Sequence, residues 1–167
     1  MAKRSFANWS WTPTAVANAA TMTANGACFL QGAGAAQRFL ISEISISGLA
    51  TVTSPLQMML ARDSTVAVTT ITLGTNGSDA PMDPQTTSTA QTTGFSATTM
   101  PQRNAALQLL SLGLNAQGGI YRWNAPIGVG AEIVVFGTAI NVGEVSLSVN
   151  TGGTPGLIES HIIYEAA

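Results

Sequence analysis

Hydrophobic and polar residues alternate with a period of two along several short stretches of this chain. In the clearest stretch, Glu144–Asn150, three apolar residues share one face of an extended chain, while one acid and two serines share the other. Alternation of this kind is typical of a half-buried β-strand. Comparable runs recur at Phe39–Ser47, Pro55–Arg62, Val66–Leu73, Ala106–Asn115, Ile120–Trp123, Glu132–Phe136 and Leu157–Glu165.

These runs are separated by segments that mostly carry Gly, Pro or Asn, and no stretch keeps a helical period between capping residues. Many short strands with frequent turn signals predict a two-sheet sandwich or a barrel. We therefore expect an all-β fold, a jelly-roll-like antiparallel β-sandwich of about 8–10 short strands.

Two segments fall outside the regular pattern. Residues 1–37 are predicted to form an N-terminal arm and a first short strand, ahead of a β-sandwich domain at 38–167. Within that domain, residues 74–102 are predicted to form one long, Thr-rich loop. Loops of this length are usually functional or disordered, so we expect this one to extend over the surface and touch a partner.

The chain carries few charges. Of 167 residues, 6 are Lys or Arg and 8 are Asp or Glu, a charged fraction of 8% where roughly 25% is usual for a soluble domain. The six cations form no cluster, which excludes an electrostatic nucleic-acid binder. The net charge of -2 and the apolar fraction of 46% exclude a disordered tail. Thr, Ser, Asn and Gln suit surfaces that end up against other protein, because they carry no charge-desolvation penalty.

Groups suited to catalysis are scarce. His161 is the only histidine, and no Gly-x-Ser-x-Gly turn supplies a nucleophilic serine. Cys28 lies in an apolar run and is expected to be a small buried hydrophobe. Asp79 and Asp83 lack the spacing of an EF-hand loop. We therefore expect no enzyme, no catalytic residue, no metal, no cofactor and no small-molecule substrate.

Four large apolar residues are the candidate interface residues. Trp9 and Trp11 are two residues apart in the arm, so an extended chain points both to one side. They dock either on the protein's own core or on a neighbouring subunit, where buried tryptophan is a frequent hot spot. Met82 and Phe95 are the corresponding candidates in the long loop.

Several segments resemble a pattern found among small virion proteins of tailed phages. In it a strand ends in Gly, a loop with Pro leads to a strand that closes on Arg, and a Thr-rich run precedes a Thr/Ala-Pro-x-x-Asp-Pro-like element. The matching segments here are Ser45–Gly48, Ser54–Pro55, Leu60–Thr65 and Ala80–Pro84. Three later segments resemble the family's aromatic Arg-Trp strand with its Pro turn, the following strand and the final strand: Tyr121–Pro126, Glu132–Val135 and Ile162–Glu165. The likeness spans residues 38–165, and the Trp-bearing arm and the longer loop depart from it.

This resemblance implies a capsid decoration (cement) protein of β-sandwich or jelly-roll fold. Such proteins bind the outside of an icosahedral head and bridge neighbouring major capsid protein subunits, usually as homodimers or homotrimers. The expected partners are the major capsid protein and further copies of the chain, without nucleic acid or membrane. The resemblance implies a location on the virion surface. Synthesis is expected in the host cytoplasm, because residues 1–9 lack the apolar core of a secretory signal.

Two other interpretations stay open at this point. The chain is then either another phage virion component of the same fold, such as a head-fibre base or a carbohydrate-binding module, or a small hydrolase. A binding module would display aromatic side chains around a concave face. A hydrolase would depend on His161 or on a pair of carboxylates.

Overall fold

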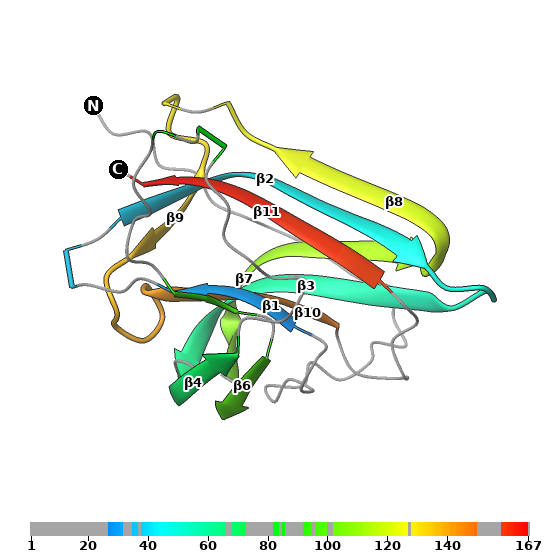
Figure 1. Ribbon diagram of the computed structural model, residues 1–167, viewed down its shortest axis with the longest axis horizontal. Coiled ribbons are helices and arrows are strands. Elements are labelled where there is room, and N and C mark those ends of the chain that lie inside the picture. The colour runs from blue at the N-terminus through cyan, green and yellow to red at the C-terminus, as the bar shows by residue number, and fades with distance from the viewer. Residues whose placement is uncertain are drawn as a thin grey trace.

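The described part of the chain is built from β-strands (Figure 1). The computed structural model describes residues 27–31, 35–36, 38–65, 68–72, 82–83, 85, 92–94, 96–99, 102–126, 128–149 and 158–166. These residues contain eleven strands and no helix: β1 (Ala27–Gln31), β2 (Arg38–Leu49), β3 (Pro55–Thr65), β4 (Val68–Thr72), β5 (Thr92–Gly94), β6 (Ser96–Thr99), β7 (Gln102–Asn115), β8 (Gln117–Asn124), β9 (Ile133–Phe136), β10 (Glu144–Val149) and β11 (Ile158–Ala166).

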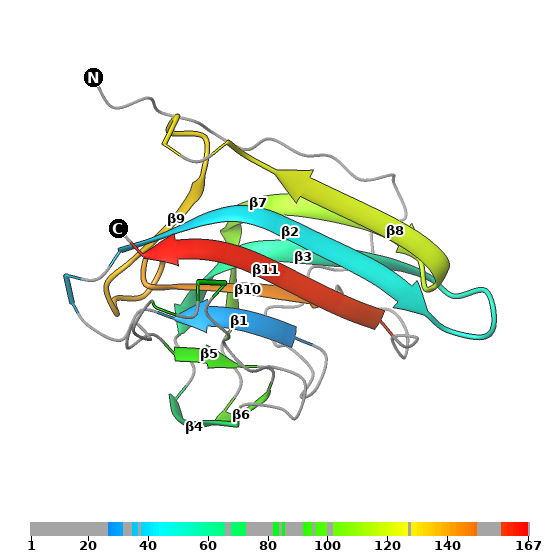
Figure 2. The ribbon, with the colours of Figure 1, turned by 45° about the horizontal axis from the view of Figure 1, so that its top comes forward.

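The strands form two antiparallel sheets that lie one over the other (Figures 1 and 2). The first sheet has five strands in the order β5-β1-β10-β3-β7. The second has the order β11-β2-β8, and β9 pairs with the first residues of β2 beside β8. A separate two-stranded sheet joins β4 to β6. The predicted all-β, antiparallel and sandwich-like architecture is confirmed.

Strand pairing is nested along the chain. The outermost pair is β1 with β10, and inside it β2 pairs with β8 and β9. Further inside, β3 pairs with β7, and the innermost pair is β4 with β6. Successive pairs alternate between the sheets, because β1/β10 and β3/β7 belong to the five-stranded sheet while β2 and its partners form the other. β5 and β11 add one strand to the edge of each sheet.

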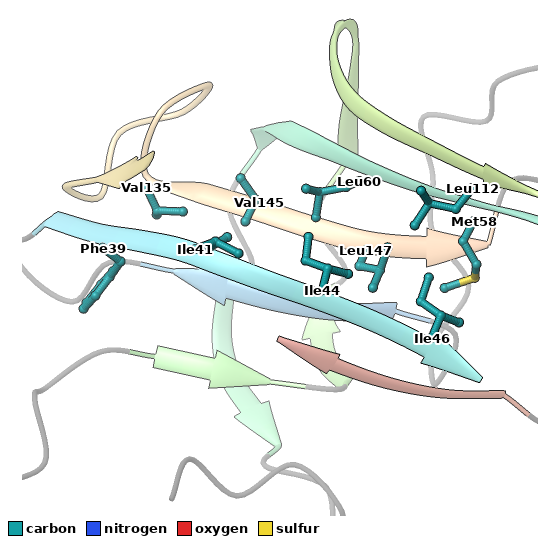
Figure 3. Packing of buried hydrophobic residues seen from close by; sticks show 10 residues of the cluster. All are labelled: Phe39, Ile41, Ile44, Ile46, Met58, Leu60, Leu112, Val135, Val145 and Leu147. Carbon is teal, nitrogen blue, oxygen red and sulfur yellow. The ribbon is translucent and has the colours of Figure 1, made fainter. Parts of the chain in front are cut away.

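The core lies between the two sheets (Figure 3). Its members come from β2 and β9 on one side and from β3, β7 and β10 on the other. The alternation that predicted the strands explains which residues point inward, since successive side chains of a strand face opposite sides. The buried cluster comprises Phe39, Ile41, Ile44, Ile46, Met58, Leu60, Leu112, Val135, Val145 and Leu147.

A β-bulge at Ser42 changes the inward-facing parity of β2. The register with β11 shifts at this point, so Ser42 has no partner residue there. The Ser42 hydroxyl donates to the Ile163 carbonyl (3.3 Å), and the Ser42 carbonyl accepts from the Ala125 amide (2.8 Å). The extra residue moves the buried set from odd to even positions, from Phe39 and Ile41 to Ile44 and Ile46.

One segment differs from the sequence prediction. The segment 74–102, predicted as one loop, contains β5 and β6, and β7 begins at Gln102. The pattern missed these strands because they are Thr-rich and lack large apolar residues, although β-branched threonine favours extended backbone. The first short strand expected within residues 1–37 corresponds in position to β1, which pairs with β10 and belongs to the five-stranded sheet. Residues 1–26 lie outside the described residues.

Candidate functional site

Three residues with exposed apolar side chains lie on the elements at one end of the sandwich, where β2 turns into β3 and β7 into β8 (Figures 1 and 2). We call Leu49, Val52 and Ile120 the turn patch; Ile120 is 80% exposed. Strand register brings them together, because Leu49 pairs with Gln117 at the start of β8. The Gln117 side chain also donates to the Thr51 carbonyl (3.2 Å), which ties the turn before Val52 to β8.

A second apolar group lies at the opposite end, on β9 and the loop that leads to β10 (Figures 1 and 2). We call Phe136, Ile140 and Val142 the loop patch; all three are between 43% and 55% exposed. The loop 137–143 is closed by a hydrogen bond from the Phe136 amide to the Val142 carbonyl (3.0 Å). Asn141 adopts a left-handed φ of 65°, a conformation that Asn tolerates better than most residues.

Side chains and backbone of β3 and β7 hold the loop patch in place. Arg62 donates to the carbonyls of Val134 (2.8 Å) and Val142 (3.3 Å). The Asn141 amide donates to the Asp63 carbonyl (2.8 Å), and Asn104 donates to the Asn141 side chain (2.7 Å).

Behind this loop lies a buried polar cluster on the face of the five-stranded sheet opposite the core. Strand register arranges it in two adjacent rows across β10, β3 and β7. One row is Ser146, Ala61 and Gln108. In the other row, Asp63 of β3 pairs with Arg103 of β7. Because Val145 of β10 pairs with Arg62, the preceding residue Glu144 lies opposite Asp63 on the β10 side. The polar cluster comprises the five buried polar residues of these rows: Asp63, Arg103, Gln108, Glu144 and Ser146.

The cluster keeps Asp63 protonated at neutral pH. Burial, with the neighbouring Glu144 carboxyl, raises the pKa of Asp63 to about 9, against the Ser146 hydrogen bond and the Arg103 charge, which lower it. Asp63 Oδ1 accepts from the Ser146 hydroxyl at 2.6 Å. Oδ2 finds no donor among the described groups, which is consistent with a protonated Asp63 carboxyl beside Glu144. Burial lowers the pKa of Arg103, and the Asp63 charge opposes this.

Gln108 is the poorly satisfied member of the cluster. Its side chain is 6% exposed, and neither the amide nitrogen nor the amide oxygen has a hydrogen-bond partner in the described structure. An unsatisfied buried polar group costs about 1–3 kcal/mol. This position therefore reduces the stability of the fold.

Sequence reasoning missed this cluster. The alternation in β10 identified the polar face of Glu144 and Ser146, and a polar strand face normally points to solvent. Here Glu144 and Ser146 are fully buried. The available signal was that an acid, Asp63, directly follows the predicted strand Pro55–Arg62 in a chain with only 14 charged residues.

Of the predicted interface residues, only Met82 can be placed. It is 84% exposed, beside Asp83, whose carboxylate accepts from the Gln85 amide (2.9 Å). Trp9, Trp11 and Phe95 lie outside the described residues. The structure neither brings the four together nor separates them.

The outer face of the second sheet is polar and exposed. Arg122 forms an ion pair with Glu43 (2.6 Å), and Ser47 donates to Glu159 (3.3 Å). His161 lies on β11 opposite Ser45 and is exposed. A shallow hollow of about 310 Å³ is lined by Ser42, Glu43, Asn124, Ala125 and Pro126.

Within the described ranges, no group of three or more His, Cys, Asp and Glu side chains is placed to hold a metal ion. The same ranges hold no helix of the length and apolarity that a membrane span requires. Comparison with protein-family models, with curated proteins and with solved structures gives no match to this chain.

Proposed function

We propose that this chain is a structural virion protein, a capsid decoration (cement) protein that binds the outside of an icosahedral phage head. In this role it bridges and stabilises major capsid protein subunits, and it acts as a homodimer or homotrimer. The observation that carries the proposal is the pair of apolar patches at opposite ends of a sparsely charged sandwich. A bridging protein needs two separate contact surfaces, and weak contacts repeated over a lattice give strong overall attachment.

The chemistry of the two patches supports protein rather than nucleic acid as the partner. Large exposed apolar side chains stabilise an interface when a partner removes them from water, by about 1.5–3 kcal/mol for each fully buried residue. The turn patch and the loop patch together offer six such side chains. Trp9 and Trp11 of the arm, with Met82 and Phe95 of the long segment, remain candidates for further contacts.

We also propose that the sandwich is a jelly roll. A jelly roll arises when a long antiparallel hairpin of nested strand pairs is rolled into two sheets. The nested pairs β1/β10, β2/β8–β9, β3/β7 and β4/β6 support this topology. In this scheme β4 and β6 are the hairpin tip, and β5 and β11 are additions to the sheet edges.

A carbohydrate-binding module of the same fold has less support. Such a module needs aromatic side chains displayed around a concave face, and the shallow hollow beside Glu43 is lined by none in the described structure. The strand next to it carries Tyr121 and Trp123, but both pack against the core.

Sedimentation with phage heads tests the proposal. Wild-type protein is mixed with intact and emptied heads, and we expect it to pellet with both. One variant replaces all three turn-patch residues by serine, and another does the same for the loop patch. Each should bind about 100-fold more weakly, because every 1.4 kcal/mol of lost contact energy is a factor of ten. Leu107→Ser, which alters an exposed apolar residue of β7 outside both patches, is the matched control.

A folded wild-type protein that fails to pellet with any head would refute the cement function. Circular dichroism of each variant shows whether the β fold survives substitution. Binding that weakens equally in the Leu107→Ser control would show that the patches are not the contact surfaces.

A further inference from the structure

We propose that Asp63, Glu144 and Arg103 form a proton-controlled latch that holds the loop 137–143 against the five-stranded sheet. The latch is closed when the two carboxyl groups share a proton, and it opens when that proton is lost. This inference concerns the folded protein alone and does not depend on the identity of its partner.

Asp63 links the cluster to the loop. Its backbone carbonyl accepts from the Asn141 amide of the loop (2.8 Å), while its side chain accepts from Ser146 of β10 (2.6 Å). Asp63, near the end of β3, therefore contacts the loop through its backbone and the cluster through its side chain. Asn104 of β7, which directly follows the Asp63 partner Arg103, adds a second contact to Asn141.

The charges around Asp63 balance only with the shared proton in place. Glu144 of β10 and Arg103 of β7 are the charged groups that face it from the neighbouring strands. Arg62 lies next in β3 but directs its guanidinium to the carbonyls of Val134 and Val142. The loop 137–143 contains no titratable residue. With one proton, a single carboxylate balances Arg103; without it, two buried carboxylates face one guanidinium.

The direction of the pH response follows from this balance. Burial and Glu144 raise the pKa of Asp63 to about 9, so the latch is closed at neutral pH and opens as the pH rises through that value. Opening weakens the hydrogen bond by which the Asp63 carbonyl holds the Asn141 amide. The loop patch, which includes Ile140 and Val142, then loses its fixed position.

Hydrogen exchange measured by mass spectrometry tests the latch in the full chain. The protection of the peptide that covers 137–143 is measured from pH 6 to pH 10 and corrected for intrinsic exchange. In the wild type we expect protection to be constant up to pH 8 and to fall about 10-fold by pH 10, because each pH unit above a pKa lowers the protonated fraction tenfold. Peptides from β2 serve as an internal reference.

Two variants separate the latch from general alkaline loosening. Asp63→Asn keeps the acceptor for Ser146 and a fixed donor toward Glu144, so its loop should stay protected at pH 10. Glu43→Gln alters an acid paired with Arg122 on the exposed sheet, and it should behave as the wild type. Loss of protection in Asp63→Asn equal to that of the wild type would overturn the proposal, as would constant protection in the wild type.

A measurement on the wild type alone covers the case in which Asp63→Asn does not fold. Infrared spectroscopy distinguishes a protonated carboxyl group from a carboxylate. We expect a protonated carboxyl band at pH 7 that disappears above pH 9, in step with the loss of loop protection. A spectrum without that band at pH 7 would overturn the latch.

Discussion

Replacing Gln108 by methionine should stabilise the protein. The Gln108 side chain is 6% exposed, and its two amide atoms have no hydrogen-bond partner in the described structure. Methionine has a similar length and shape, so the substitution removes two unsatisfied polar atoms without opening a cavity. Each such atom costs about 1–3 kcal/mol. After allowance for imperfect packing of the new side chain, we expect a net gain of about 2 kcal/mol in the free energy of unfolding.

The gain is measured by urea unfolding at pH 7, followed by circular dichroism. The midpoint should rise with an unchanged m-value, since the surface exposed on unfolding is the same. The corresponding rise in Tm is about 4–8 °C, at 2–4 °C per kcal/mol for a domain of this size.

The matched control is Gln57→Met on β3. Gln57 donates to the Ser111 hydroxyl at 2.7 Å, so its replacement leaves Ser111 with one fewer bond. We expect this variant to lose about 1 kcal/mol. The reasoning is refuted if Gln108→Met is folded but no more stable than the wild type, because Gln108 then has a polar partner in solution.

Three further predictions test other parts of the structure. Gly48→Ala should be strongly destabilising in thermal unfolding, by about 2 kcal/mol or more, because the new Cβ would lie 2.2 Å from the Ala116 carbonyl oxygen. The free energy of unfolding should fall as the pH rises from about 5 to 9, by up to about 1.4 kcal/mol per pH unit. The reason is that Asp63 loses its proton in the unfolded chain but keeps it in the folded protein up to a pKa of about 9. The urea midpoint should therefore change less with pH in Asp63→Asn than in the wild type. Arg122→Ala should change Tm little, and even less at high salt, because its ion pair with Glu43 is exposed to solvent.

Strand positions were predictable where one face of the strand packs on the core. β10 illustrates this, since Val145 and Leu147 face the core as their alternation required. β2 was harder, because the bulge at Ser42 shifts the buried set by one position midway. That shift depends on hydrogen bonds from Ser42 to β11 and from Ala125, which come from residues about 80 to 120 positions away. A local pattern contains no information about such partners.

The polar cluster could not be predicted from the local sequence pattern for the same reason. Glu144, Asp63 and Arg103 belong to three strands that are far apart in the sequence, and only the register of β10 with β3 and of β3 with β7 brings them together. The patches could be anticipated only in part. Ile120 was recognised as a strand residue, but its exposure follows from the alternation in β8, where Tyr121 and Trp123 take the positions that face the core.

The few charges of the chain are placed unevenly, and this placement bears on function. Burying Asp63, Glu144 and Arg103 is expensive, and a well-packed apolar trio at such a site is often as stable or more stable. The cluster is therefore a poor device for stability alone. It does join three strands in one register, and through the Asp63 carbonyl it fixes the loop that carries Ile140 and Val142. The fixed position of an exposed apolar surface is what a bridging contact requires, because an interface formed by a pre-ordered loop loses less conformational entropy on binding.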